Sequence, residues 1–287
     1  MDALPGHCVK PQTHFCGVLT TIWAQSAHFS FSSPLHRGLW WALGCILVCR
    51  LLPACSAPAA EVSYVITAWH HERPVPMGAD VVAAGINLDG RVDAVEGLGC
   101  GGALDLVSAD GRTGIDNQYA SSLLAWLEAA LGDLGEEIAR SPEGSWVLDI
   151  DHIDDLRDEV DVFIYEGTAS GQRGPLLASA TGSLRGEWLE VRLGTLPLPM
   201  GQAVGSPLVE HAMIRLRLFP ERMLAEEITG ELGASVPLET VLTVSRVFEP
   251  SLDLASAERM AMPDLDWDGD GACEAVSLGV GFSAQRL

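Results

Sequence analysis

The segments Ser145–Ile153 (SWVLDIDHI) and Val160–Thr168 (VDVFIYEGT) decide the fold that we expect for this sequence. In both segments apolar and polar side chains alternate, which is typical of strands with one face toward a core. Residues 154–159 between them (DDLRDE) are mostly polar, which predicts a turn. The two segments therefore predict a β-hairpin.

The same period of two continues on both sides of this hairpin. Gly and Pro separate the segments at regular intervals, as turns between strands would. Such a succession predicts an antiparallel sheet that is curled or packed into a sandwich. The further candidate strands are 61–69 (EVSYVITAW), 81–88, 176–184 (LLASATGSL), 187–198 (EWLEVRLGTLPL), 211–219 (HAMIRLRLF) and 223–232 (MLAEEITGEL).

Two segments carry helical patterns instead. Asp116 is a good N-cap, and the apolar residues that follow it recur at helical spacing until about Arg140, just before Ser141 and Pro142. These are Tyr119, Leu123, Leu127, Ala130, Leu134 and Ile138. Ser235 and Pro237 predict a second helix over about 237–248. The expected fold class is thus α+β, mainly an antiparallel, sandwich-like sheet with two or three packed helices.

The charge is strongly acidic, with 17 Lys and Arg residues against 39 Asp and Glu residues. Residues 1–54 contain three of the basic residues and one acid, so the rest of the chain holds 14 basic and 38 acidic residues, a net charge of −24. Such a surface repels phosphate backbones, which argues against nucleic-acid binding. Divalent cations are its natural counterions, although acidity also simply keeps an exported protein soluble.

The N-terminal segment has the features of an export signal. Residues 38–49 (GLWWALGCILVC) are apolar but fewer than the ~20 residues that span a bilayer, which suits the apolar stretch of a signal peptide. Residues 51–55 (LLPAC) resemble the lipobox of bacterial lipoproteins. The resemblance implies cleavage before Cys55 and lipid attachment to its sulfur, which would anchor the chain to a membrane. The alternative is a short buried helix followed by an ordinary cysteine.

This interpretation divides the chain into a leader (1–54), a lipid-anchored tether (55–60) and one exported domain (61–287). Ser56, where an Asp would imply retention in the inner membrane, favours the outer membrane by analogy. After the leader and Cys55 are set aside, Cys100 and Cys273 are the remaining cysteines. An oxidising compartment favours a disulfide between them, and two buried free thiols are the alternative.

The sharpest motif is the acidic stretch 264–274 (DLDWDGDGACE). Alternating aspartates with Gly in a turn place several carboxylates around one point, and Ca²⁺ takes 6–8 oxygen ligands. No register supplies the Glu that completes an EF-hand, and the stretch is instead similar to the short DxDxDG loops of dockerin-like and thrombospondin type 3-like repeats. The resemblance implies a calcium site, and a solvated acidic turn is the alternative. The candidate ligands here are Asp264, Asp266, Asp268, Asp270 and Glu274.

A disulfide between Cys100 and Cys273 would bring acidic turns from both ends of the domain together. We therefore expect Asp89, Asp93, Asp110 or Asp116 to supply the ligands that the C-terminal loop lacks. The combination of DGRTGIDNQYA (110–120) and DGDGACEAVSLGVGF (268–282) behind a lipobox resembles a group of uncharacterised lipoproteins from myxobacteria and their relatives. This resemblance implies location and fold rather than activity.

Sequence signals of enzymes are weak. The sequence has no GxSxG nucleophile elbow and no P-loop. His70 and His71 lack the spacing of a zinc-binding helix and are expected on the surface, and the acids around Asp149 are expected to face water. We therefore expect a calcium-stabilised, lipid-anchored domain with a binding or structural role at the cell envelope. The alternatives are a β-rich periplasmic carrier of an apolar ligand and, third, an unrecognised hydrolase.

Overall fold

The computed structural model describes residues 61–90, 106–140, 145–151, 159–168, 170–218, 225–268, 270 and 272–287. All of them belong to one compact unit, Pro58–Leu287. Its strands are β1 (Val62–His70), β2 (Val75–Met77), β3 (Asp80–Val82), β4 (Ser145–Asp151), β5 (Glu159–Gly167), β6 (Arg173–Arg185), β7 (Trp188–Pro197), β8 (Leu208–Arg217), β9 (Glu227–Pro237) and β10 (Ala275–Arg286). Its helices are the π-helix η1 (Tyr119–Leu123) and the α-helices α3 (Leu124–Leu131), α4 (Leu134–Arg140), α5 (Leu238–Phe248) and α6 (Leu254–Ala261).

Eight of the strands form a closed antiparallel barrel in the order β1-β10-β9-β8-β7-β6-β5-β4, while β2 and β3 form a separate two-stranded sheet. The sandwich-like α+β fold predicted from the sequence is therefore wrong. The barrel closes because β1 pairs with β10 on one side and with β4 on the other, with Tyr64 opposite Leu148. This closure joins the first strand to two segments that are distant in the sequence. The alternation of apolar and polar residues shows where a strand lies, but it does not show which distant strands pair. The hairpin between β4 and β5 is confirmed, with Ile150 opposite Val162.

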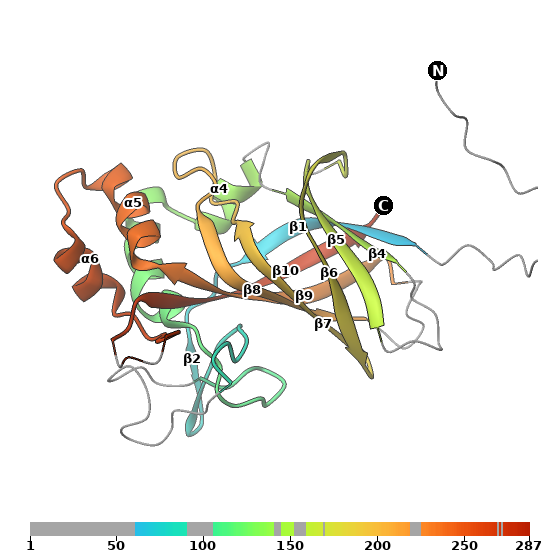
Figure 1. The fold of residues 1–287 in the computed structure, drawn as a ribbon, viewed down its shortest axis with the longest axis horizontal. Helices are drawn as coiled ribbons and strands as arrows, with labels where there is room; N and C mark the ends of the chain where they lie inside the picture. The colour runs from blue at the N-terminus through green and yellow to red at the C-terminus, as the bar shows by residue number, and fades with distance from the viewer. Residues whose placement is uncertain are drawn as a thin grey trace, which may run out of the picture. The chain divides into compact units, whose positions relative to one another are not determined.

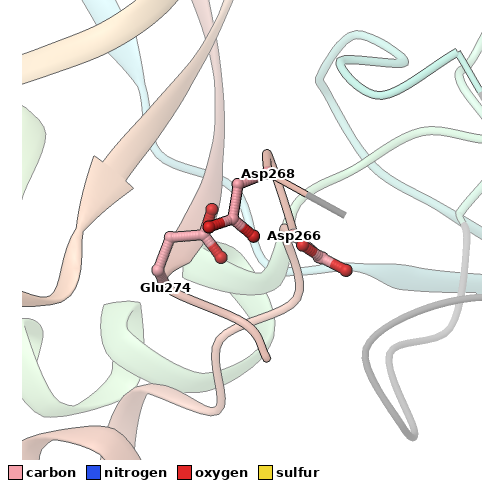
Figure 2. Close-up of side chains that lie close together, drawn as sticks. All are labelled: Asp266, Asp268 and Glu274. Atoms are coloured by element: carbon pink, nitrogen blue, oxygen red, sulfur yellow. The ribbon is translucent and has the colours of Figure 1, made fainter. Parts of the chain in front are cut away.

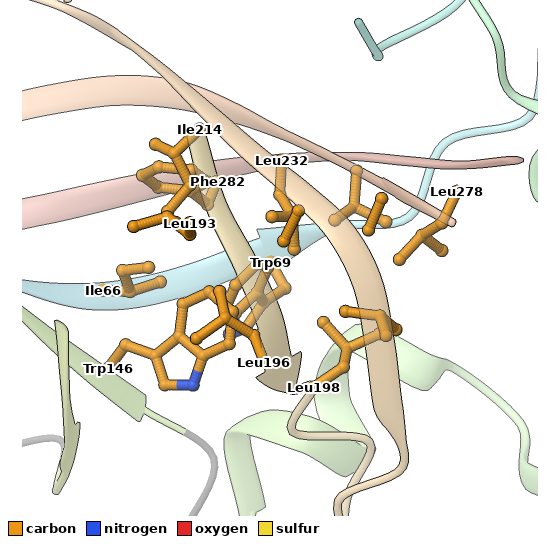
Figure 3. Close-up of a cluster of buried hydrophobic side chains, with 14 of the residues drawn as sticks. Ile66, Trp69, Trp146, Leu193, Leu196, Leu198, Ile214, Leu232, Leu278 and Phe282 are labelled. Carbon is orange, nitrogen blue, oxygen red and sulfur yellow. The ribbon is translucent and has the colours of Figure 1, made fainter. Parts of the chain in front are cut away.

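Alternation sends one face of each strand into the barrel, and these side chains fill its interior. Trp69 packs edge-on against Trp146, with ring centroids 5.1 Å apart, and the ring centroid of Phe282 lies 5.7 Å from that of Trp69. Figure 3 shows these rings among leucine and isoleucine side chains from several strands. A filled interior is typical of eight-stranded barrels, in which side chains occupy the available width.

A β-bulge in β7 keeps the apolar side chains on both sides of it pointing into the barrel. The pairing of β7 with β8 shifts on both sides of Gly194, whose φ of +77° belongs to the left-handed region that favours glycine. The bulge lets Leu193 and Leu196, which are three positions apart, both point into the barrel. Without it, the outer half of β7 would turn its apolar face to solvent.

The helices cover one end of the barrel, and Figure 1 shows α5 and α6 beyond that end. The helix predicted over 116–140 is interrupted at Gly132, where φ is +85°, so α3 and α4 are separate. Asp116 is not its cap, because the side chain of Asn117 accepts the hydrogen bond from the Ala120 N–H. The helix predicted over 237–248 is confirmed as α5, which follows β9 directly.

A small cavity of about 40 Å³ lies between these helices and the barrel mouth. Apolar side chains from η1, α3, α5 and the ends of β7, β8 and β10 line most of it, among them Leu127, Val241 and Leu278. This volume is about that of one or two water molecules. The described residues contain no helix long and apolar enough to cross a membrane.

Candidate metal site

The acidic loop between α6 and β10 is built as a short closed turn. Leu265 pairs with Ala275 in an isolated antiparallel bridge, and the Glu274 N–H donates to the carbonyl oxygen of Leu265 at 3.1 Å. The Asp264 N–H also donates to the carbonyl of Ala275 at 3.0 Å. These bonds hold the two ends of the loop together, so the residues between them curve back on themselves.

Three carboxylates of this loop converge. Asp266, Asp268 and Glu274 each place one oxygen within 4.8 Å of the others, and Figure 2 shows the three side chains grouped at the turn. Oxygens around one Ca²⁺ ion lie at 2.3–2.6 Å from it, so no two ligands are more than ~5 Å apart. The spacing of this group therefore suits a hard divalent cation.

Hydrogen bonds within the loop orient two of these carboxylates. The Trp267 N–H donates to Glu274 Oε1 at 2.7 Å, and the Asp270 N–H donates to Asp268 Oδ1 at 3.1 Å. Asp270 itself accepts a hydrogen bond from the Ala272 N–H at 2.7 Å. The Asp270 carboxylate therefore stabilises the turn and is not one of the three converging carboxylates, although Asp270 was predicted from the sequence to be a ligand.

Asp264 lies at the base of the loop and is mostly buried. Its two oxygens accept hydrogen bonds from the Ser277 N–H, at 2.7 Å, and from the Ser277 hydroxyl. Burial raises the pKa of Asp264 to about 6, although the hydrogen bonds from Ser277 oppose this shift. Asp264 thus ties the acidic loop to β10, and it stands apart from the converging group.

The acidic turn near residue 89 lies beside this loop. Asp116 is buried and accepts hydrogen bonds from the N–H groups of Leu88, at 2.6 Å, and Asp89, at 3.4 Å. Burial raises the pKa of Asp116 to about 7, and the negative charges of Asp89 and Asp264 add to the increase. Like charges shift a pKa mainly at short range, so the carboxyl groups of Asp89, Asp116 and Asp264 lie close to one another beside the loop.

Asp110 lies elsewhere. Its carboxylate receives hydrogen bonds from Arg215 at 2.8 Å and from Arg112 at 2.9 Å, on the outer face of β8. Burial raises the pKa of Asp110, but hydrogen bonds from Ser108, Arg215 and Arg112 outweigh it and hold the pKa below its usual range. The DGRTG turn at 110–114 therefore attaches its loop to the barrel wall.

Other expected residues lie outside the described part of the chain, namely Cys55, Asp93 and Cys100. The lipid anchor, the Cys100–Cys273 disulfide and a ligand role for Asp93 stay predictions. Asp149 is buried and bonded to Arg173 at 2.8 Å, so it does not face water freely as expected. His71 was also expected on the surface, but its ring contacts Tyr119 and its Nε2 atom is buried.

The residues that hold the loop against the barrel were not predicted from the sequence. Trp267 donates from its ring Nε1 to the Ser235 hydroxyl on β9 at 3.0 Å, and its ring stacks on His211 of β8, with centroids 4.0 Å apart. One feature of the sequence could have indicated this contact, namely a tryptophan between two aspartates of a polar turn. A loop that is fully exposed to solvent has no need of an aromatic residue, so this one suggests packing against the barrel.

The fold and this site define an acidic up-and-down barrel with a candidate cation-binding loop at its helical end. No family model, no curated protein and no solved structure matches the chain. The evidence for a function therefore comes from the geometry of the site.

Proposed function

We propose that this chain is an exported, lipid-anchored β-barrel domain that binds Ca²⁺ in the loop 264–275 and has a structural or binding role at the cell envelope. The observation that carries the proposal is the convergence of Asp266, Asp268 and Glu274 within 4.8 Å. Three carboxylates this close repel one another in water, and a divalent cation would remove that repulsion.

The surrounding charge favours a cation at this loop. The carboxylates of Asp89 and Asp264 lie next to it, and their negative charges help to raise the pKa of the buried Asp116. Calcium suits the loop better than Mg²⁺, because Ca²⁺ tolerates irregular oxygen geometry whereas Mg²⁺ demands a near-ideal octahedron. Backbone carbonyls and water would complete the coordination.

The test is thermal unfolding of the protein in Ca²⁺ and in chelator. An ion bound only to the folded state stabilises it by about 2.7 kcal/mol when its concentration is a hundred times its Kd. We expect a higher Tm in Ca²⁺, and we expect Asp266→Asn and Asp268→Asn to reduce the increase. Asp270→Asn is the matched control, since it removes the same charge from the same loop outside the converging group. Equal melting curves for the parent protein in Ca²⁺ and chelator would refute the calcium site.

The anchor and the disulfide belong to the same proposal and rest on the residues of the sequence alone. Fatty-acid labelling of the protein in bacterial cells should be lost in Cys55→Ser. A disulfide between Cys100 and Cys273 would tie residues near 100 to the acidic loop, so Cys100→Ser should weaken Ca²⁺ binding. Unchanged Ca²⁺ affinity in that variant would count against this role of the disulfide.

The barrel fold also suits the second candidate, a carrier of an apolar ligand, because eight-stranded barrels can hold one small molecule. The packed interior of the barrel argues against this function, because it leaves little space for a ligand. Trp69, Trp146 and Phe282 occupy the barrel interior, and the cavity beneath the helices measures about 40 Å³. Ligand pockets usually measure about 300–1,000 Å³, so a carrier function would require this core to rearrange.

A further inference from the structure

Trp267 has an unusual place in the acidic loop. It lies between two converging carboxylates, Asp266 and Asp268, and its N–H donates to the third, Glu274 Oε1, at 2.7 Å. Its side chain contacts the barrel. One residue therefore connects the backbone that carries the carboxylates to two strands of the wall.

Both strands contribute a specific partner. On β9, the buried hydroxyl of Ser235 accepts the hydrogen bond from Trp267 Nε1 at 3.0 Å. On β8, the imidazole of His211 stacks on the indole, with a centroid distance of 4.0 Å and an interplanar angle of 20°. The stacked imidazole fixes the plane of the indole. The hydrogen bond lies in that plane and fixes the rotation of the indole within it.

The backbone of β8 is distorted where His211 contributes its ring. The pairing of β8 with β9 shifts between Glu210 and Met213, which marks a bulge. Within it, His211 has a φ of +50°, in the left-handed region that non-glycine residues seldom adopt. Bulges commonly re-aim a side chain next to a functional site, and this one brings the imidazole onto Trp267.

We infer that His211, Ser235 and Trp267 form a clamp that positions the carboxylates of the loop, so that the barrel wall sets its affinity for Ca²⁺. The inference rests on the proposed calcium function and adds positioning residues to it. Without the clamp, the three carboxylates would spend part of their time apart, and ordering them would oppose ion binding. The clamp holds them together before the ion arrives.

The test uses the full chain and measures Ca²⁺ affinity by calorimetry in three variants. His211→Asn removes the ring but keeps a residue that tolerates positive φ. Ser235→Ala removes the hydrogen-bond acceptor, and Ser283→Ala is the control, because Ser283 bonds an imidazole, that of His70, elsewhere on the barrel. We expect the Kd for Ca²⁺ to rise about three- to tenfold in the first two variants and to stay constant in the control.

Two further measurements accompany the calorimetry: Tb³⁺ luminescence reports where the ion lies, and melting in chelator reports general stability. Tb³⁺ replaces Ca²⁺ at oxygen sites and luminesces when a nearby indole is excited. We expect sensitised Tb³⁺ emission from the parent protein, displaced by Ca²⁺, and loss of that emission in Trp267→Phe even at saturating Tb³⁺. Melting in chelator should change little in His211→Asn and Ser235→Ala.

The outcomes distinguish failure of the clamp from failure of the calcium site. If the parent protein binds Ca²⁺ and both clamp variants bind it equally well, the clamp is overturned and the calcium function stands. Persistent Tb³⁺ emission in Trp267→Phe would likewise overturn the placement of the indole beside the ion. If the parent protein itself binds no Ca²⁺, the clamp and the proposed function both fail.

Discussion

At the scale of single residues, the side chain of Asn117 satisfies backbone hydrogen-bonding groups at one end of the barrel. Its Nδ2 atom donates to the carbonyl oxygens of Ala84, at 2.7 Å, and Gly279, at 2.9 Å, while its Oδ1 atom accepts from Gly279 N–H and Ala120 N–H at 3.1 Å. The amide thus continues the hydrogen bonding of β10 beyond the end of β1 and also binds a backbone N–H at the start of η1.

Replacing this amide should be costly, because its removal would leave buried backbone groups without partners. We expect Asn117→Ala to lower the free energy of unfolding by about 3 kcal/mol or more, as measured by urea unfolding. Asn87→Ala is the matched control, since Asn87 accepts a turn hydrogen bond from Gly90 N–H in an exposed position. A loss below about 1 kcal/mol in Asn117→Ala would contradict this role.

The lowered pKa of His71 should make the free energy of unfolding depend on pH. Burial lowers its pKa from 6.5 to about 4, while the charge of Asp133 opposes the decrease and that of His70 adds to it. Between pH 6.5 and 4 the unfolded chain binds the proton more readily than the folded protein does. The His71 contribution to the free energy of unfolding therefore falls as pH falls through this window, by up to about 3 kcal/mol.

The comparison of the parent protein with His71→Gln isolates this contribution. Gln does not titrate and can still accept a hydrogen bond from the Tyr119 hydroxyl, which lies 3.1 Å from His71 Nδ1. We expect the stability difference between the two proteins to change between pH 7 and pH 4, in favour of the variant at acid pH. A constant difference across that range, measured in chelator, would show that His71 does not titrate in this way.

At the scale of elements, the segment 83–88 lies directly on β10. An added Cβ on Gly279 would come within 2.5 Å of the Ala84 carbonyl oxygen and 2.8 Å of Gly85 Cα. Both are backbone atoms, so a methyl group there would displace the whole segment. On Gly281 in the same strand, the nearest atom would be His70 Cβ, at 3.4 Å.

These two glycines give a matched pair of variants. We expect Gly279→Ala to cost about 1–3 kcal/mol, because overpacking forces backbone shifts, and to speed amide hydrogen exchange in residues 83–88. Gly281→Ala, which makes the same chemical change two residues away, should have a smaller effect on both. Similar losses in the two variants would mean that segment 83–88 is not held against β10 at Gly279.

At the scale of the whole molecule, the packed interior makes a prediction about ligands. Trp146 is 1% exposed and fills space that an apolar ligand would need. We expect Trp146→Ala to cost about 3–5 kcal/mol and to create a cavity that binds an apolar fluorescent dye. The parent protein should bind neither the dye nor a fatty acid.

Trp188→Ala is the control for this experiment, because Trp188 lies on the outer face with the Arg215 guanidinium 3.6 Å from the centre of its ring. It should remove an indole without opening the core. Stoichiometric fatty-acid binding by the parent protein would instead favour the carrier function and would show that the packed core rearranges.

Features that depend on neighbours along the chain could be predicted from the amino-acid sequence. Alternation placed the hairpin of β4 and β5, Ser235 and Pro237 marked the start of α5, and alternating aspartates marked the loop in which Asp266, Asp268 and Glu274 converge. These features follow from the period of a strand, from capping and from turn chemistry, which act over a few residues.

Contacts between distant segments could not be predicted in this way, because they depend on the complete fold. Closure of β1 onto β4 made a barrel in place of a sandwich, and Asp110 was paired with Arg215 instead of joining the acidic loop. The same long-range packing placed His211 and Ser235 around Trp267. The physical reason is that local pattern tells which face of an element is buried, whereas its partner is chosen by the free energy of packing the whole chain.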